Sequence, residues 1–234
     1  MVKKKRISKE EKEIKIVATK KQNKQLIWAV ILMLCLIIIV LIVPFIMNNF
    51  VNKFNYLGLT FYKTKTGTVV LYSTSIPVID AKGNTIGDYK MNFRSDPRKL
   101  NYINTNSIAD NEIRFVREKT IFIATSTEMK GCEDTYLAIA NFANFLNGFA
   151  RLNLKGAVSN KTYAKENNIT YASCKDYPDN TVISINSGNS TKIERNSETC
   201  YNIIYEGCDI IKATEKFNLM VINSYMKYYQ VTKK

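Results

Sequence analysis

An uncharged run of 21 residues, 27–47 (IWAVILMLCLIIIVLIVPFIM), divides the chain into two very unequal parts. It is long enough to cross a bilayer as a helix, because the hydrocarbon core requires about 20 apolar residues at the helical rise. Backbone polar groups in lipid must be satisfied within the segment, so a helix is the expected structure. The sequence therefore predicts a basic tail over 1–26, a transmembrane helix over 27–47 and a domain over 48–234.

The charges beside the apolar run predict its orientation. Residues 1–26 carry ten Lys or Arg against three Glu, and positively charged segments stay on the cytoplasmic side. We expect a single-pass protein of the cytoplasmic membrane, with the amino terminus inside and residues 48–234 outside. The alternative is a cleaved signal peptide, whose apolar core has roughly 7 to 15 residues and ends at small residues. Here the core is longer and ends in Phe45, Ile46 and Met47, which favours an uncleaved signal anchor.

Composition excludes several classes of function. The formal net charge is +14, but half of it lies in the tail, where topology and anionic lipid explain it. The outer domain has no basic block, so no nucleic-acid partner is expected. The chain has no histidine, which excludes Ser-His-Asp and Cys-His catalytic groups, histidine zinc sites and histidine pH switches.

Four of the five cysteines lie in the predicted outer domain, where disulfides persist. Their spacing lacks the close pairs of structural zinc sites and of thioredoxin-like redox motifs. We therefore expect two disulfides, no metal and no cofactor, with three pairings open. We favour Cys174 with Cys200, closing a compact β unit, and Cys132 with Cys208, joining the starts of two helices.

The first part of the outer domain, 54–95, is typical of β structure. Segments 54–64 and 68–80 are rich in β-branched and aromatic residues and are separated by a short Lys-Thr-Gly turn, which predicts a hairpin. After a turn over 81–87, residues 88–94 alternate as a third strand. These strands begin almost directly after the apolar run, so we expect the near face of the domain to lie close to the lipid surface.

The segment FRSDPRKL, residues 93–100, resembles the start of a helix. Ser95 or Asp96 suits a capping position, and Pro97 suits the first helical position. This capping interpretation explains the pattern by itself. A functional alternative is an anion-binding corner beside the helix amino terminus; its basic residues are Arg94, Arg98 and Lys99.

Residues 112–234 alternate between β and α patterns. Segments 112–117 and 119–127 are predicted strands, and 133–153 is a predicted helix with Glu133 and Asp134 in its first turn. Its expected core stripe consists of Leu137, Ala140, Phe142, Phe145, Leu146 and Phe149. A strand over 154–160 completes a β-α-β unit, the order of a parallel crossover.

The last third continues this alternation. We expect a short helix over 162–168, a strand over 169–173, a hairpin of 181–187 with 190–195, and a final helix over 208–230 packed on the sheet. The predicted fold class is therefore α/β (mixed α+β). A transmembrane helix precedes a disulfide-stabilised ectodomain, whose mixed sheet contains a βαβ unit and two main helices.

Five runs of the outer domain carry a resemblance to a known family: FRSDPRKL, LAIANFANFL, LKGAVSNKTYAKENNITYASC, NTVISINSGNSTKIE and CYNIIYEGCDIIKATEKF. They resemble an uncharacterised family of small single-pass membrane-anchored proteins of DPANN archaea. The similarity covers most of the outer domain. It implies an archaeal cell surface, and it brings no activity and no catalytic residue with it.

Few motifs carry chemistry. There is no GxGxxG, P-loop, GxSxG or HExxH, so we assign no catalytic residue. A Ser-Lys dyad or a carboxylate pair leaves no readable spacing and stays open. Three sequons, at Asn160, Asn168 and Asn189, permit surface glycans.

Two functions of different classes fit these patterns. The favoured one is a non-enzymatic surface component that binds another envelope protein, a surface glycan or a host-cell surface. The other is a membrane-tethered enzyme or ligand receptor with a pocket at the carboxyl ends of the parallel strands, after Thr125 and Val158. Convergence of Lys130, Glu133 or Asn160 there would favour the second. A subunit of a larger membrane machine is a third hypothesis.

Overall fold

The computed structural model describes residues 24, 26–46, 52–80, 82–108, 112–127, 129 and 132–232. The chain separates into two compact units, Met1–Asn52 and Lys53–Lys234. The first unit contains one apolar helix, Leu26–Ile46, whose side chains are all exposed. It is long and apolar enough to cross a membrane. Most of the predicted basic tail lies outside the described residues.

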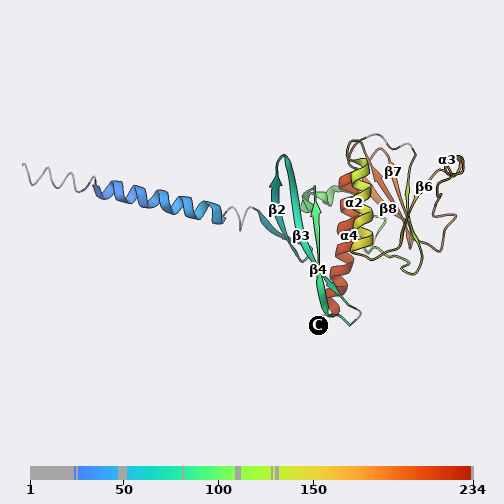
Figure 1. Cartoon of the computed structure of the whole chain (residues 1–234), viewed down its shortest axis with the longest axis horizontal. Helices are drawn as coiled ribbons and strands as arrows, with labels where there is room; N and C mark the ends of the chain where they lie inside the picture. The colour runs from blue at the N-terminus through green and yellow to red at the C-terminus, as the bar shows by residue number, and fades with distance from the viewer. Residues whose placement is uncertain are drawn as a thin grey trace, which may run out of the picture. The chain divides into compact units, whose positions relative to one another are not determined.

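The second unit is a mixed α/β domain with three layers (Figure 1). A four-stranded antiparallel sheet and a five-stranded mixed sheet lie on either side of two helices, α2 (Thr135–Gly148) and α4 (Ile210–Thr232). One hydrophobic cluster contains buried residues of both sheets and both helices. The helix layer therefore shares a single core with the two sheets, and the predicted fold class is confirmed.

The antiparallel sheet has the order β1 (Lys53–Tyr56), β2 (Leu59–Thr66), β3 (Val69–Ile79) and β4 (Thr85–Phe93). The β2–β3 hairpin and the following strand were predicted. The single strand predicted over 54–64 is wrong, because the chain reverses at Leu57 and Gly58. Their φ angles are 52° and 75°, the left-handed values that a two-residue hairpin turn requires.

The β-α-β unit in the second half is confirmed. Strand β5 (Ile121–Thr125) leads through α2 to β6 (Leu154–Val158), and the two strands are parallel neighbours. Helix α3 (Lys161–Glu166) follows, as predicted, on the way to β7. Figure 1 shows α2 and α3 on opposite sides of the mixed sheet. The two crossovers therefore leave adjacent strands toward opposite faces.

The predicted hairpin of 181–187 with 190–195 is wrong. Strands β7 (Val182–Ser187) and β8 (Lys192–Ser197) are separated by β9 (Cys200–Tyr205) in a sheet of order β6-β5-β7-β9-β8. Strand β9 runs parallel to β7 and antiparallel to β8. Four of the six β9 residues are buried, whereas β8 has one buried residue. Burial therefore places the more apolar strand inside the sheet and leaves the charged one at the edge.

Two other predicted strands are absent from the described residues. Residues 112–116 form no strand, because side chains accept hydrogen bonds from their backbone N–H groups. The N–H of Ile113 donates to Ser224 Oγ at 3.1 Å, and the N–H of Arg114 donates to the Tyr201 hydroxyl at 2.7 Å. Of 169–173, only Tyr171 makes a β-bridge, to Val158. Both segments have the composition of strands but lie beside the sheet.

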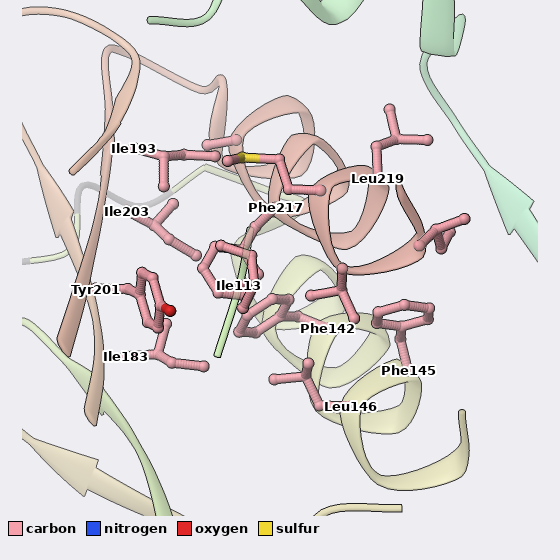
Figure 2. Packing of buried hydrophobic residues seen from close by; sticks show 14 of the residues in the cluster. Ile113, Phe142, Phe145, Leu146, Ile183, Ile193, Tyr201, Ile203, Phe217 and Leu219 are labelled. Atoms are coloured by element: carbon pink, nitrogen blue, oxygen red, sulfur yellow. The ribbon is translucent and has the colours of Figure 1, made fainter. Parts of the chain in front are cut away.

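Aromatic side chains from three layers build the core, and Figure 2 shows its part between the helices and the mixed sheet. The Phe217 ring of α4 lies 5.5 Å from Phe142 of α2 and 5.5 Å from Tyr201 of β9. On the other side, Tyr89 of β4 lies 6.2 Å from Phe145 of α2. The predicted stripe of α2 is wrong at its first two positions. Leu137 is 40% exposed and Ala140 is also exposed, whereas the four later residues are buried.

A smaller apolar cluster covers the outer face of the mixed sheet. Phe122, Ala124 and Val182 point to this face and are buried. The Tyr177 ring covers Phe122, with 4.6 Å between the ring centroids. Strand β5 is therefore buried on both faces, as its nearly continuous apolar sequence predicts.

Candidate functional site

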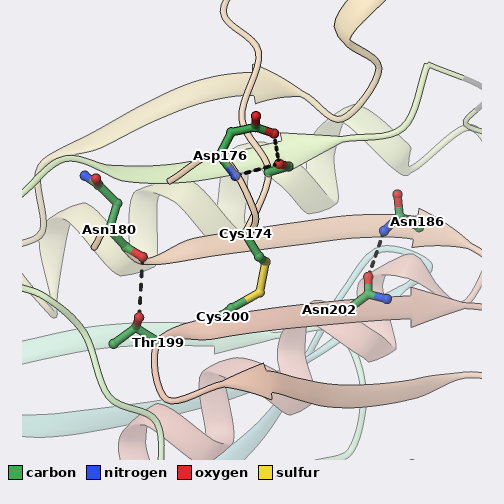
Figure 3. Close-up of a disulfide and its surroundings, with 8 residues drawn as sticks. Cys174, Asp176, Asn180, Asn186, Thr199, Cys200 and Asn202 are labelled. Carbon is green, nitrogen blue, oxygen red and sulfur yellow. Dashed lines mark hydrogen bonds between the residues drawn. A yellow bond between two sulfur atoms is a disulfide. The ribbon is translucent and has the colours of Figure 1, made fainter. Parts of the chain in front are cut away.

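The two disulfides have the pairing that the sequence favoured. Cys132 is bonded to Cys208, just before α2 and α4, and Cys174 is bonded to Cys200 at the start of β9. Figure 3 shows the second bridge, which ties the loop after α3 to the outer face of the sheet. Within the described residues, Cys35 of the apolar helix is the free cysteine.

The basic residues of FRSDPRKL do not form an open anion site. Arg94 makes an ion pair with Asp134, with 2.6 Å between Nη1 and Oδ1. Arg98 makes two bonds to Asp96, of 3.0 Å and 2.7 Å. Lys99 is exposed on the surface of the short 3-10 helix η2 (Pro97–Tyr102). Both guanidinium groups therefore already have a carboxylate partner.

The capping interpretation of the same segment is confirmed. Asp96 is the N-cap of η2, its side chain accepts a hydrogen bond from Arg98 N, and Pro97 follows at the start of the helix. The carboxyl pKa of Asp96 is lowered, first by the hydrogen bond from the Arg98 side chain. Glu133 and Asp134 were expected in the first turn of α2, but that helix begins at Thr135. Asp134 binds Arg94 instead.

A buried carboxylate below this corner was not predicted. Glu215 of α4 is 8% exposed, and its oxygens accept hydrogen bonds from the backbone N–H groups of Arg94 and Ser95. Burial raises its pKa to about 6, and the N–H donors oppose that rise only in part. Its burial follows from the position of α4 between the two sheets, which the sequence did not predict.

The predicted pocket at the strand ends is only partly described. Thr125 and Val158 are register partners at the ends of β5 and β6, and Ser159 N donates to Thr125 O at 3.1 Å. Asn160 does not point a free amide oxygen into this region, because that oxygen accepts a bond from Tyr163 N as the α3 cap. Glu133 is exposed, and Lys130 lies outside the described residues.

The three sequon asparagines all lie on the surface. Asn160, Asn168 and Asn189 are exposed, and Asn168 has a positive φ of 51°. Asparagine tolerates this left-handed conformation better than most residues. Each position is accessible to a modifying enzyme.

The structure forms a pocket elsewhere, with a volume of about 180 Å³. It lies between α4, the β1–β2 turn and the segment from the end of η2 to Thr105. Its lining residues are Tyr56, Leu57, Asn101, Thr105, Lys216, Leu219, Met220 and Asn223. Three segments far apart in the sequence contribute to it, so no local sequence motif predicts this pocket.

Lys216 is the charged group of this pocket. Its ammonium lies 3.4 Å from Asn101 Oδ1, which also accepts a 2.9 Å hydrogen bond from the Tyr56 hydroxyl. Burial lowers the pKa of Lys216 and raises that of Tyr56. No ion pair joins Lys216 to a carboxylate within the part of the chain that the structure describes. The pocket therefore combines one positive charge with neutral amide and hydroxyl groups.

Comparisons of the chain with protein-family models, with curated proteins and with solved structures give no match.

Proposed function

We propose that the chain is a single-pass membrane protein whose outer domain is a non-enzymatic binding component of the cell surface. The observation that carries the proposal is the exposed apolar helix Leu26–Ile46 preceding a domain with two disulfides. A helix of this length matches the bilayer core, and disulfides persist outside the cytosol. The resemblance to anchored archaeal proteins agrees with a cell-surface location.

The chemistry of the described polar groups supports binding more than catalysis. Arg94, Arg98 and Asp96 are engaged in ion pairs and a helix cap, which stabilise the fold. The lysine in the pocket faces neutral amide and hydroxyl groups. General acid-base catalysis uses titratable groups with pKa values set apart by their surroundings, whereas a lone cation among neutral donors suits ligand recognition.

The first experiment tests anchoring and orientation in whole cells. Membranes from cells that express the full chain are washed with alkaline carbonate, and intact cells are treated with trypsin before the fragments are identified by mass spectrometry. The proposal predicts that the chain stays in the washed membrane. It also predicts that trypsin removes peptides of the outer domain while the basic tail stays protected. Release of a chain beginning near residue 48 would show a cleaved signal peptide and refute the anchor.

A second candidate function is a ligand receptor or enzyme with its site at the ends of β5 and β6. The observation that favours it is the exit of the two crossovers toward opposite faces, the point where open α/β sheets bind ligands. A ligand there would protect residues 159–163 from hydrogen exchange when the protein is mixed with small molecules from its source cells. Unchanged exchange in these residues would count against this function.

A further inference from the structure

The pocket beside Lys216 contains more hydrogen-bond donors than the fold uses. The ammonium has three N–H groups, and its one hydrogen bond within the described part of the chain is to Asn101 Oδ1 at 3.4 Å. Among the described residues, the amide nitrogen of Asn101, the amide of Asn223 and the hydroxyl of Thr105 have no hydrogen-bond partner, although all three line the pocket. These donors are available to a ligand.

The charge of the pocket indicates the charge of that ligand. Among the residues that the structure describes, no acidic residue lines it, and Lys216 is its one cation. A half-buried ammonium without an anion is stabilised when an anion binds, because binding replaces the lost hydration. A single lysine with neutral donors suits a group of one negative charge, whereas phosphate recognition usually draws on arginine forks or several cations. A carboxylate is the matching group.

The remaining walls indicate what carries the carboxylate. Leu57, Leu219 and Met220 supply the apolar part of the lining, beside the amide and hydroxyl groups. A volume of about 180 Å³ is smaller than the roughly 300–1,000 Å³ of pockets that enclose a drug-sized molecule. A sugar ring has hydroxyls for the polar groups of the lining and C–H groups for the apolar ones, and one ring is a small ligand.

We propose that this pocket binds a carboxylate-bearing sugar residue, with Lys216 pairing the carboxylate and Asn101, Thr105 and Asn223 bonding ring hydroxyls. The inference rests on the proposed binding role and gives that role a ligand class. An acidic sugar could come from a surface glycan or from free monosaccharide, and the carboxylate chemistry is the same in both.

The test uses the full chain in lipid nanodiscs, titrated by NMR with D-galacturonate, with D-galactose as the neutral control and with inorganic phosphate. We expect galacturonate to bind, and galactose to bind at least about tenfold more weakly, because a charge-assisted bond is lost. Lys216→Met, which keeps the buried length of the side chain, should weaken galacturonate binding by a similar factor. Lys99→Gln removes a nearby charge outside the pocket and should change nothing.

A second variant keeps the test independent of folding. Asn101→Asp is isosteric, and its carboxylate would occupy the position already 3.4 Å from the Lys216 ammonium. This intramolecular partner should compete with galacturonate and weaken binding while the fold is retained, as measured by circular dichroism. Binding that is unchanged in both pocket variants would overturn the proposal. So would equal affinity for phosphate or galactose, or no binding of galacturonate. The titration does not depend on the location of the chain, so its failure is separate from a failure of membrane anchoring.

Discussion

Glu215 offers the most direct test of how burial and hydrogen bonding compete in this domain. Its carboxylate is 8% exposed and accepts two backbone N–H groups. Burial disfavours the charged form, whereas the N–H donors favour it. Because burial has the larger effect, its pKa rises from the ordinary 4.5 to about 6.

The sign and size of the consequence follow from linkage. Between these two pKa values the folded protein holds a proton that the unfolded chain has already released. The stability contributed by protonated Glu215 is therefore complete below pH 4.5 and is lost as the pH rises through about 6. A rise from 4.5 to about 6 corresponds to about 2 kcal/mol in the free energy of unfolding.

The variant Glu215→Gln removes this dependence. The substitution also alters a hydrogen bond, which shifts the free energy of unfolding by about 1–3 kcal/mol at every pH. The informative quantity is therefore how the stability difference between the variant and the wild type varies with pH. Relative to the wild type, we expect the variant to gain about 2 kcal/mol between pH 4 and pH 8. Urea unfolding of the full chain in micelles, followed by near-ultraviolet circular dichroism, measures it. Trp28 lies in the apolar helix and does not report on the domain.

Exposed Glu133→Gln is the matched control for removing one negative charge from the same domain. If the stability difference between Glu215→Gln and the wild type stays constant from pH 4 to pH 8, the raised pKa of Glu215 is refuted. A variant that instead loses stability as the pH rises would mean that the N–H donors outweigh burial.

Three further predictions concern stability. Replacing Cys132 and Cys208 together by serine should lower the free energy of unfolding by about 4.5 kcal/mol, if the disulfide acts through chain entropy. This is about 1 kcal/mol more than the loss from replacing Cys174 and Cys200, because the two disulfides close loops of 76 and 26 residues. Equal losses in urea unfolding would contradict this prediction. Phe142→Ala should lower the free energy of unfolding by about 3–5 kcal/mol because Phe142 is fully buried. Tyr136→Ala should change it by no more than about 0.5 kcal/mol because Tyr136 is 84% exposed. Similar shifts of the melting temperature for both variants would contradict the placement of Phe142 in the core. Asp96→Asn keeps a helix cap but loses the ion pair with Arg98, so the variant should be about 1 kcal/mol less stable than the wild type at pH 7. This difference in stability should shrink as the pH falls below 3.8, because the carboxyl pKa of Asp96 is lowered in the folded protein. A difference that grows on acidification would argue against the ion pair.

Local patterns predicted several elements correctly for reasons contained in the segments themselves. The proline and aspartate of FRSDPRKL fit a helix start, and the structure has η2 there. The spacing of Phe142, Phe145 and Leu146 indicated the buried face of α2. The prediction of the same stripe failed at Leu137 because Thr135 and Ala138 form the buried face of the first turn, and Leu137 lies on the exposed side of the helix.

Strand pairing shows the limit of local reasoning. The patterns of β7 and β8 are consistent with a hairpin, and their short connection favours one. The chain instead inserts β9 between them, since its buried residues stabilise the sheet interior more than the charged side chains of β8 can. The pocket beside Lys216 was missed for a related reason, because its donors come from segments that meet only in the fold.

The sequence by itself determined the apolar helix, the mixed α/β class and the presence of disulfides. The length of the apolar run, the hydrophobic period of each segment and the number of cysteines can be read directly from the sequence. Their structural consequences do not depend on which distant segments pack together. Only the tertiary structure decided the order of the mixed sheet, the burial of Glu215 and the position of Lys216 in a pocket beside Asn101 and Tyr56. Burial and the pKa values it changes depend on which distant segments pack together, and the free energy of that packing belongs to the whole domain.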